Sequence, residues 1–322
     1  MKITPIFIFS LPRSGSTLLQ KIIMSHTKIA SISEPWILLP LLYLKNNKGH
    51  VTEYSQNTAS KAIDDLINNL PNGVDDYNES IKLFSNNIYK KLCSKGEIYY
   101  LDKTPRYYLI MREIAEIYPD AKFIFLFRNP LEIYSSILHS FLNNNFFKLA
   151  HYDVDIKYGP KLLSDGYTLL KNKSLLVTYE NLINKTDENL VKIFKYLELD
   201  TDIDEIKNIF FKKDLKGKMG DNIGTKKYNS ISKLSLNKYK NTFNNIFRYY
   251  HIKNYIKMFD SEYLKLIDIN KQNLYYSIKL KNINILYSIF DLINYFLGKI
   301  NLFFKLNLFF GKNRLKNKSF LS

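Results

Sequence analysis

Residues 6–19 read IFIFSLPRSGSTLL, an apolar run that stops at a Leu-Pro pair and resumes after an arginine, a glycine and several hydroxyl residues. This order predicts a strand, a tight turn and a helix. Such a turn can hold phosphate, because the first N–H groups of a helix have no intrahelical partner and its dipole favours an anion. An ordinary capped turn would also select Ser and Thr, so the motif alone leaves its ligand open.

The candidate phosphate ligands are the five consecutive residues Arg13, Ser14, Gly15, Ser16 and Thr17. Gly15 lets the backbone approach a ligand closely, and the hydroxyls of Ser16 and Thr17 add hydrogen-bond donors. The stretch lacks the first glycine and the lysine of the P-loop that hydrolyses nucleoside triphosphates. It is therefore a poor candidate for that chemistry.

A second strand–turn–helix pattern lies in residues 121–140, AKFIFLFRNPLEIYSSILHS. Arg128 stands at the predicted end of the strand, and Ser136 follows eight residues later. Ligands of open α/β sheets bind outside the carboxyl ends of the strands, so two such turns from neighbouring strands would face one crevice. An arginine fork is a preferred partner for phosphate, although a surface ion pair is the alternative role for Arg128.

Composition narrows the class of protein. The chain has 322 residues, 46% of them hydrophobic, and a formal net charge of +17. This balance favours phosphorylated ligands, polyanions or an acidic membrane surface. The lysines are scattered and no nucleic-acid motif is present, so we expect no nucleic-acid partner. Cys93 is the only cysteine and the histidines show no ligand spacing, so we expect no metal and a cytoplasmic location.

Short apolar runs alternate with helical patterns along the first two hundred residues, which predicts an α/β fold with a parallel sheet and helices on both faces. The predicted strands are Ile3–Phe9, Ile29–Ser33, Ile98–Leu101, Phe123–Phe127 and Leu175–Thr178. The predicted helices are Ser16–Ser25, Arg106–Tyr118, Pro130–Phe141 and Asp187–Leu197.

The character of the sequence changes after about residue 260, so we expect a main domain over 1–260 and a helical extension over 261–322. The extension is rich in Phe, Leu and Ile, with basic residues at its end. No uninterrupted apolar run reaches the roughly 18–20 residues of a membrane-spanning helix. Two interpretations stay open: helices that pack on the protein or on a second copy in a homodimer, and an amphipathic helix at a membrane surface.

Four segments together resemble the family of sulfotransferases that use 3′-phosphoadenosine 5′-phosphosulfate (PAPS). FIFSLPRSGSTLL and FIFLFRNPLEIYSSIL resemble its two signature segments, and LLVTYENLINKTDENLVKIFKYLEL resembles its strand followed by a Tyr-Glu pair and a helix. LDKTPRYYLIMREIAEIYPDAKFIF resembles bacterial and Golgi-type members. The resemblance extends over roughly residues 6–200. It implies a P-loop-like three-layer fold, PAPS as donor, adenosine 3′,5′-bisphosphate (PAP) as product, and no metal.

The resemblance also implies roles for the donor-binding residues. Residues 13–17 would hold the 5′-phosphosulfate, and Arg128 with Ser136 would hold the 3′-phosphate. Tyr179 would lie near the adenine. A late basic segment often covers the 3′-phosphate in this family, which makes Lys226 and Lys227 candidates.

Sulfuryl transfer by in-line displacement needs a base for the acceptor and positive charge at the leaving oxygen. Arg13 in the turn and Lys103 after another predicted strand are the candidate cations; in tyrosylprotein-type members a lysine in a similar segment assists the transfer. We assign the base to Glu34, which follows the second predicted strand and matches the catalytic glutamate of that type. A carboxylate at a helix start before Pro35 is the alternative role.

The acceptor is not encoded in any motif of the sequence. A carbohydrate, a lipid-linked sugar and a peptide tyrosine all suit a basic, aromatic-rich surface, and we favour carbohydrate. Two other functions stay open at this stage: a P-loop kinase, and a non-enzymatic module that binds nucleic acid or membrane.

Overall fold

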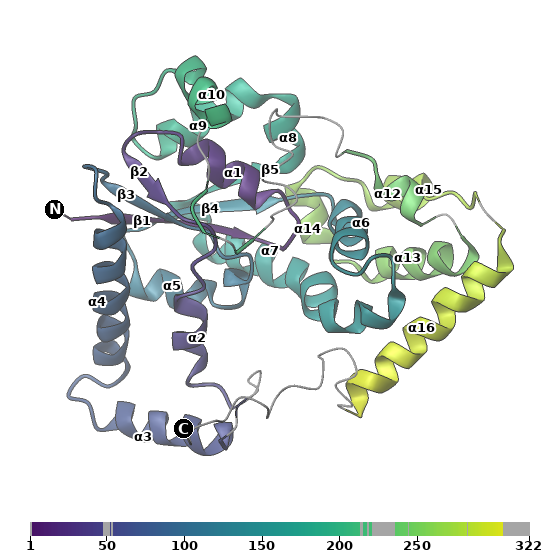
Figure 1. Ribbon diagram of the computed structural model, residues 1–322, viewed down its shortest axis with the longest axis horizontal. Helices are drawn as coiled ribbons and strands as arrows, with labels where there is room; N and C mark the ends of the chain where they lie inside the picture. The colour runs from purple at the N-terminus through teal and green to yellow at the C-terminus, as the bar shows by residue number, and fades with distance from the viewer. Residues whose placement is uncertain are drawn as a thin grey trace, which may run out of the picture. The chain divides into compact units, whose positions relative to one another are not determined.

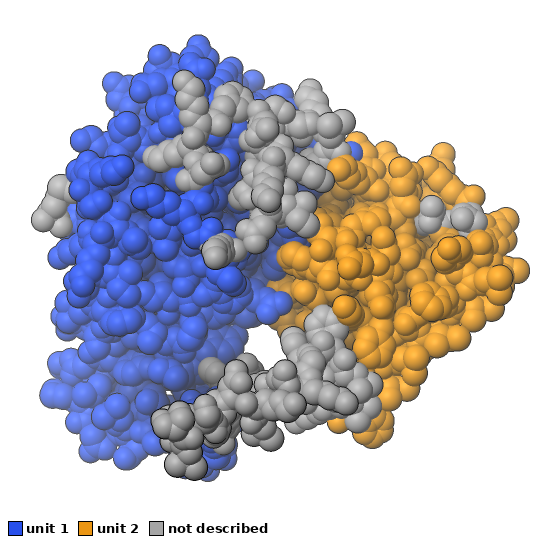
Figure 2. All heavy atoms as spheres, in the orientation of Figure 1, with its two compact units in different colours: residues 1–128, 161–236 blue, residues 129–160, 237–322 orange. Residues whose placement is uncertain are grey.

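The structure is a computed structural model that describes residues 2–47, 52, 54–212, 215–217, 219–220, 236–243, 245–281 and 283–304. The chain divides into two compact units, coloured separately in Figure 2. Unit 1 comprises Met1–Arg128 and Lys161–Leu236, and unit 2 comprises Asn129–Pro160 and Asn237–Ser322. The units are interleaved in the sequence, because 129–160 belongs with the C-terminal helices.

Unit 1 is built on a five-stranded sheet in the order β2-β3-β1-β4-β5, with every neighbouring pair parallel. The strands are β1 (Thr4–Ser10), β2 (Ile29–Ser31), β3 (Tyr99–Asp102), β4 (Lys122–Phe127) and β5 (Ser174–Thr178). The predicted parallel α/β sheet is confirmed, with strand ends shifted by up to two residues. β1 is central, with Phe7 opposite both Asp102 of β3 and Phe123 of β4.

The two faces of the sheet differ in composition, because side chains alternate along each strand. One face is aliphatic: Ile6 and Ile8 of β1 join the core formed with α1, α8, α9 and α10. The other is aromatic: Phe7, Phe9, Phe123, Phe125 and Phe127 pack against one another and against Tyr107, Tyr118 and Tyr167. Helices therefore cover both faces, as Figure 1 shows, and the predicted three-layer arrangement is confirmed.

The helices of unit 1 are α1 (Ser16–Ile23), α2 (Leu38–Tyr43), α3 (Gln56–Asn68), α4 (Val74–Leu92), η1 (Tyr107–Leu109), α5 (Met111–Ile117), η4 (Lys171–Lys173), α8 (Tyr179–Asn184), α9 (Thr186–Tyr196) and α10 (Ile203–Lys212). Helix α7 (Gly159–Leu170) runs from unit 2 into unit 1. The single helix predicted over Arg106–Tyr118 is wrong in one respect: it is divided into η1 and α5. Ile110, with φ −136° and ψ 27°, leaves the helical region between them.

Unit 2 is helical. It contains α6 (Pro130–Ser140), η2 (Phe146–Tyr152), η3 (Val154–Tyr158), α12 (Tyr239–Thr242), α13 (Ile246–Met258), α14 (Ser261–Leu266), α15 (Lys271–Ser277) and α16 (Ile285–Phe303). Within this unit α16 packs on η2 and α13. The predicted helical C-terminal part is confirmed over the residues that the structure describes.

Candidate active site

The turn between β1 and α1, together with the first residues of α1, has a backbone conformation that suits an anion. We call residues 13–17 the anion cradle. Arg13 and Gly15 have positive φ values of 66° and 93°, and α1 begins at Ser16 without a side-chain cap. A Cβ atom at Gly15 would overlap the ring of Tyr179, so only glycine fits there. The buried Ser14 hydroxyl has no hydrogen-bond partner among the described residues. A buried hydroxyl and helix N–H groups that lack intrahelical partners suit an anionic ligand.

Arg128 joins this turn from the neighbouring strand. It follows β4, and its Nη1 donates to the carbonyl oxygen of Arg13 at 2.9 Å. Its guanidinium lies 4.2 Å from the ring centroid of Tyr179, the first residue of α8 after β5. The carboxyl ends of β1, β4 and β5 therefore bring Arg13, Arg128 and Tyr179 together.

Lys103 connects the turn to the candidate base. It follows β3, and its Nζ donates to Glu34 Oε1 at 2.8 Å and to Thr17 Oγ1 at 3.3 Å. The side chain of Lys103 is 1% exposed and that of Glu34 is 10% exposed. Because burial weakens screening by water, the attraction between these two charges is stronger than in a surface pair, although removing both charges from water offsets part of it. The order β2-β3-β1 thus puts Glu34, Lys103 and Thr17 in one row.

The indole of Trp36 completes the surroundings of Glu34. Its Nε1 donates to Glu34 Oε2 at 3.1 Å, while its backbone N–H donates to Thr104 Oγ1 at 3.2 Å. Trp36 adopts the left-handed region, with φ 53°. Each carboxylate oxygen of Glu34 therefore accepts a hydrogen bond, which fixes the orientation of the group.

Asp102, the residue before Lys103, carries a buried carboxyl group. Asp102 Oδ2 accepts hydrogen bonds from the hydroxyls of Tyr89 at 2.7 Å and Tyr107 at 3.1 Å. Burial raises the pKa of Asp102 to about 7, against the opposing effects of the two hydroxyls and of the Lys103 charge. The Tyr107 hydroxyl also accepts from the N–H of Leu38, the first residue of α2. These hydrogen bonds connect β3, α4, η1 and α2 next to Lys103.

For three of the predicted donor-site residues the structure gives no contact with this site. Ser136 lies on α6, in unit 2, and is half-buried. Lys226 and Lys227 lie outside the described residues. Their proposed contacts with a 3′-phosphate stay predictions.

Sequence reasoning missed the contribution of the chain after α10. The N–H of Ser33 donates to the carbonyl oxygen of Lys216 at 2.8 Å, and a Cβ at Gly220 would lie 3.1 Å from Glu34 Oε1. Lys216 and Gly220 therefore lie beside Ser33 and the candidate base Glu34. Two glycines three residues apart in LKGKMG were the available signal for such a close approach.

Comparison with known proteins assigns the family. A sequence model described as "Sulfotransferase family" matches residues 5–203, which hold all five strands together with Arg13, Glu34, Lys103 and Arg128. The chain belongs to the sulfotransferase family. The family predicted from the four sequence segments is confirmed.

The sulfotransferase is similar to nodulation protein NoeE of Sinorhizobium fredii (strain NBRC 101917 / NGR234), with 30% identity over 132 residues. That match covers 41% of this chain and 30% of NoeE, so the chain spans less than a third of its relative. A sulfotransferase domain from the curacin biosynthetic pathway has a TM-score of 0.49 and 17% identity, covering 87% of this chain and all of the domain. Mouse sulfotransferase SULT7A1 complexed with PAP has a TM-score of 0.47 and 15% identity, covering 82% of this chain and 87% of the mouse protein.

Proposed function

We propose that this sulfotransferase moves a sulfuryl group from PAPS to a hydroxyl group of a carbohydrate or a lipid-linked sugar. One observation carries the proposal: the Lys103 ammonium contacts both Thr17 of the anion cradle and Glu34. A single buried cation thereby lies between the expected donor phosphosulfate and the expected base. In-line displacement puts the attacking and leaving oxygens on opposite sides of the sulfur, so it needs a base at the attacking oxygen and positive charge at the leaving oxygen.

The residues around the cradle suit the donor. Arg13, Ser14, Gly15, Ser16 and Thr17 would bind the 5′-phosphosulfate through backbone N–H groups and hydroxyls, in keeping with the buried Ser14 hydroxyl that lacks a partner among the described residues. Arg128 and Ser136 would bind the 3′-phosphate, with Lys226 or Lys227 over it and Tyr179 near the adenine. Bound PAPS would supply the sulfuryl group and PAP as the leaving group.

The proposed transfer divides the work between a base and two cations. Glu34 accepts the proton of the acceptor hydroxyl while the new S–O bond forms and the bond from sulfur to the phosphate oxygen breaks. Lys103 and Arg13 stabilise the negative charge that develops on the leaving oxygen. Protonation of Glu34 removes its attraction for Lys103, so the ammonium becomes available to the leaving group at the moment when charge appears there.

Trp36 supports the choice of a carbohydrate acceptor. Its indole is held against Glu34 by the Nε1–Oε2 hydrogen bond, so an aromatic side chain lies directly beside the proposed base. Aromatic rings combine apolar area with a polar edge, which suits the mixed surface of a sugar. The proposal also includes a cytoplasmic location and assigns this chemistry to residues 1–260, with 261–322 as an extension.

Titration calorimetry with PAP tests the donor site. We expect the wild type to bind PAP and Arg128→Ala to bind about 10- to 100-fold more weakly, because charge-assisted hydrogen bonds contribute roughly 1.5–3 kcal/mol each. Arg112→Ala is the matched control, since Arg112 is exposed on α5. Absence of PAP binding by the wild type, or tighter binding of Mg²⁺-ATP, would overturn the proposal in favour of another ligand.

Incubation with ³⁵S-labelled PAPS and a fractionated lysate tests the acceptor. We expect label in the glycan or lipid-linked sugar fraction, and no label with Glu34→Gln. Label confined to the protein fraction, with tyrosine sulfate after hydrolysis, would contradict a carbohydrate acceptor and leave the donor assignment intact.

A further inference from the structure

Helix α16 presents polar and small residues to the rest of unit 2. Its four buried residues are Ser288, Asp291, Gly298 and Asn301, which recur every three to seven positions on one side of the helix. A surface helix of a globular protein normally buries its apolar stripe and exposes its polar side. In α16 the arrangement is reversed.

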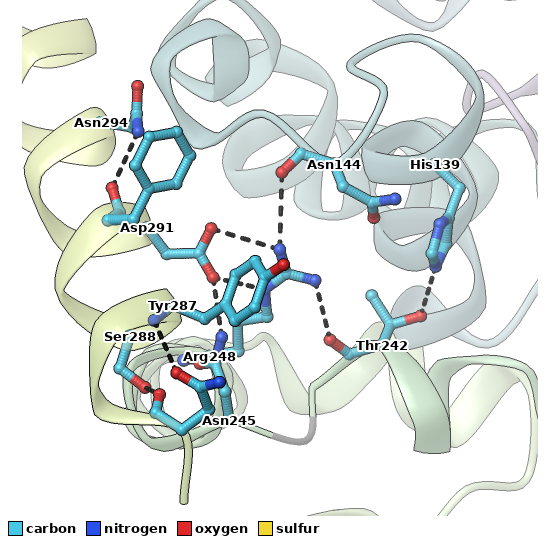
Figure 3. Close-up of polar contacts among 11 residues, drawn as sticks. His139, Asn144, Thr242, Asn245, Arg248, Tyr287, Ser288, Asp291 and Asn294 are labelled. Carbon is cyan, nitrogen blue, oxygen red and sulfur yellow. Dashed lines mark hydrogen bonds and ion pairs between the residues drawn. The ribbon is translucent and has the colours of Figure 1, made fainter. Parts of the chain in front are cut away.

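A buried ion pair holds the polar side of α16 against the rest of unit 2. Asp291 accepts from Arg248 Nε at 2.7 Å and Nη2 at 3.2 Å, and from Asn245 Nδ2 at 2.8 Å, as Figure 3 shows. Arg248 also donates to the carbonyl oxygens of Thr242 at 3.3 Å and Asn144 at 3.5 Å. Because breaking such a pair leaves a buried charge, the pair opposes rotation of α16 about its axis.

Close packing reinforces this orientation. A Cβ atom at Gly298 would overlap the backbone of Phe147 in η2, so the two backbones are in direct contact. The ring of Tyr295 lies 4.9 Å from His251 and 5.8 Å from Phe247 of α13, measured between centroids. The inward side is therefore a built interface within unit 2, and the opposite side faces outward by necessity.

The outward side of α16 is apolar along its whole length. Its large side chains are between 40% and 79% exposed. They are Ile285, Leu286, Ile289, Phe290, Leu292, Ile293, Phe296, Leu297, Ile300, Leu302, Phe303 and Phe304. A helix of 19 residues is about 28 Å long, so this strip is large for a free surface.

The part of the sequence that contains α16 is strongly basic. From Asn270 to Ser322 the sequence contains one acidic residue, Asp291, which is buried in its pair with Arg248. The same stretch contains nine basic residues: Lys271, Lys279, Lys281, Lys299, Lys305, Lys312, Arg314, Lys316 and Lys318. Among the described residues of this stretch, Lys279 and Lys299 are exposed, and an apolar helix face in a basic segment is complementary to a surface that is apolar inside and anionic outside.

We propose that the outward face of α16 binds the surface of an anionic lipid bilayer, with the helix axis in the plane of the membrane. The apolar side chains enter the boundary between headgroups and acyl chains, while the lysines contact the headgroup charges. A search of the described helices finds none that is long and apolar enough to cross a membrane. The inference rests on unit 2 alone and does not depend on the proposed sulfuryl transfer.

A second copy of the chain fits the same strip less well. Pairing two such strips would bring two sets of cations together, and like charges at an interface oppose association.

Flotation with lipid vesicles tests the proposal on the full chain. We expect the wild type to float with vesicles of phosphatidylcholine and phosphatidylglycerol (1:1) and to float poorly with pure phosphatidylcholine. The double variant Ile293→Ser/Phe296→Ser should lower the apparent binding constant by about tenfold or more, because two buried apolar side chains are lost. Leu83→Ser/Phe84→Ser on α4 is the matched control, since Leu83 and Phe84 are 64% and 52% exposed.

A second pair of variants separates the electrostatic part. Lys279→Gln/Lys299→Gln should weaken binding to the anionic vesicles several-fold, and Lys91→Gln/Lys192→Gln should leave it unchanged. All substituted residues are exposed, so we expect each variant to keep the fold. Circular dichroism melts of each variant check this.

Three outcomes would overturn the proposal. The first is absence of flotation by the wild type, and the second is equal flotation of the wild type and Ile293→Ser/Phe296→Ser. The third is a wild-type dimer in light scattering without lipid that becomes monomeric in that double variant, while neither protein binds vesicles. The last result would assign the strip to a second copy of the chain.

Discussion

Each unit of the protein contains a buried ion pair, and the two pairs are built differently. In unit 1 Lys103 Nζ contacts Glu34 Oε1 at 2.8 Å, and the same ammonium also contacts Thr17. In unit 2 Arg248 contacts both oxygens of Asp291, and Asn245 adds a third hydrogen bond to the carboxylate. The first pair has one contact between its partners, whereas the second is bidentate.

The choice of cation explains the difference. Lysine is a point charge on a flexible stem, so Lys103 can exchange one anionic partner for another, as the proposed transfer requires. The planar guanidinium of Arg248 holds a carboxylate in one orientation, as a fixed helix requires. We therefore assign the Lys103–Glu34 pair a role in the chemistry of transfer and the Arg248–Asp291 pair a role in the architecture of unit 2. Substitutions test each assignment.

Glu34→Gln should have the largest effect. Its amide oxygen can still accept from Lys103, but the side chain no longer takes up a proton. We expect kcat to fall about 10²- to 10⁴-fold, the usual contribution of a positioned base. PAP binding measured by calorimetry should stay within about threefold of wild type. A variant that keeps more than half of the wild-type kcat would remove Glu34 from the catalytic role.

Asp291→Asn should act on stability and leave catalysis in place. The substitution leaves the buried guanidinium of Arg248 without its counter-charge, a loss typically of about 3–5 kcal/mol. Urea unfolding measures this loss, and Asp268→Asn, at an exposed position, is the control. If kcat fell as far as in Glu34→Gln while stability was unchanged, the division between chemistry and architecture would be wrong.

Asp102→Asn should change how stability depends on pH. Because burial raises the pKa of Asp102 to about 7, the folded protein retains a proton between about pH 4 and pH 7 that the unfolded chain releases. Stability therefore falls as the pH rises through this window, and the fall ends near pH 7. We expect the wild type to lose at most about 3 kcal/mol between pH 5 and pH 8 from this group.

The asparagine variant should lack that part of the pH dependence, which urea unfolding at pH 5 and pH 8 detects. Asp120→Asn, at an exposed site, should behave as the wild type. Parallel profiles for wild type and Asp102→Asn would show that Asp102 does not retain its proton near neutral pH.

Trp36→Phe should have the smallest effect of the four. The ring is kept while the hydrogen bond from Nε1 to Glu34 Oε2 is lost, so the carboxylate is less firmly oriented. We expect kcat to fall about tenfold, in line with a hydrogen bond to a charged group that contributes about 1.5 kcal/mol. Steady-state kinetics that show only a higher KM for the acceptor would instead assign Trp36 to acceptor binding.

The sheet and much of the candidate site could be predicted from the sequence, because both depend on local order along the chain. Arg13, Glu34, Lys103 and Arg128 each follow a strand, and strands of one parallel sheet deliver such residues to the same edge. The sequence did not reveal that one face of the sheet is aliphatic and the other aromatic.

The rest depended on contacts between distant parts of the chain. Nothing near Asp102 indicated the hydroxyls of Tyr89 and Tyr107, and nothing near Ser33 indicated the segment that begins at Leu215. The orientation of α16 was also unpredictable, since its outward side has the composition of a core. The pairing of Asp291 with Arg248, 43 residues apart, and the close packing of Gly298 on Phe147 decide which side faces inward.

The orientation of α16 limits how the solubility of this protein can be improved. Deleting α16 to remove its adhesive surface would also delete Asp291, and Arg248 would stay behind with its charge uncompensated. The rings of Phe247 and His251 would lose Tyr295 as well. The solubility of unit 2 thus depends on the outward side of α16, and its folding depends on the inward side. Polar substitutions at outward positions such as Ile293 can improve solubility without loss of the folded structure.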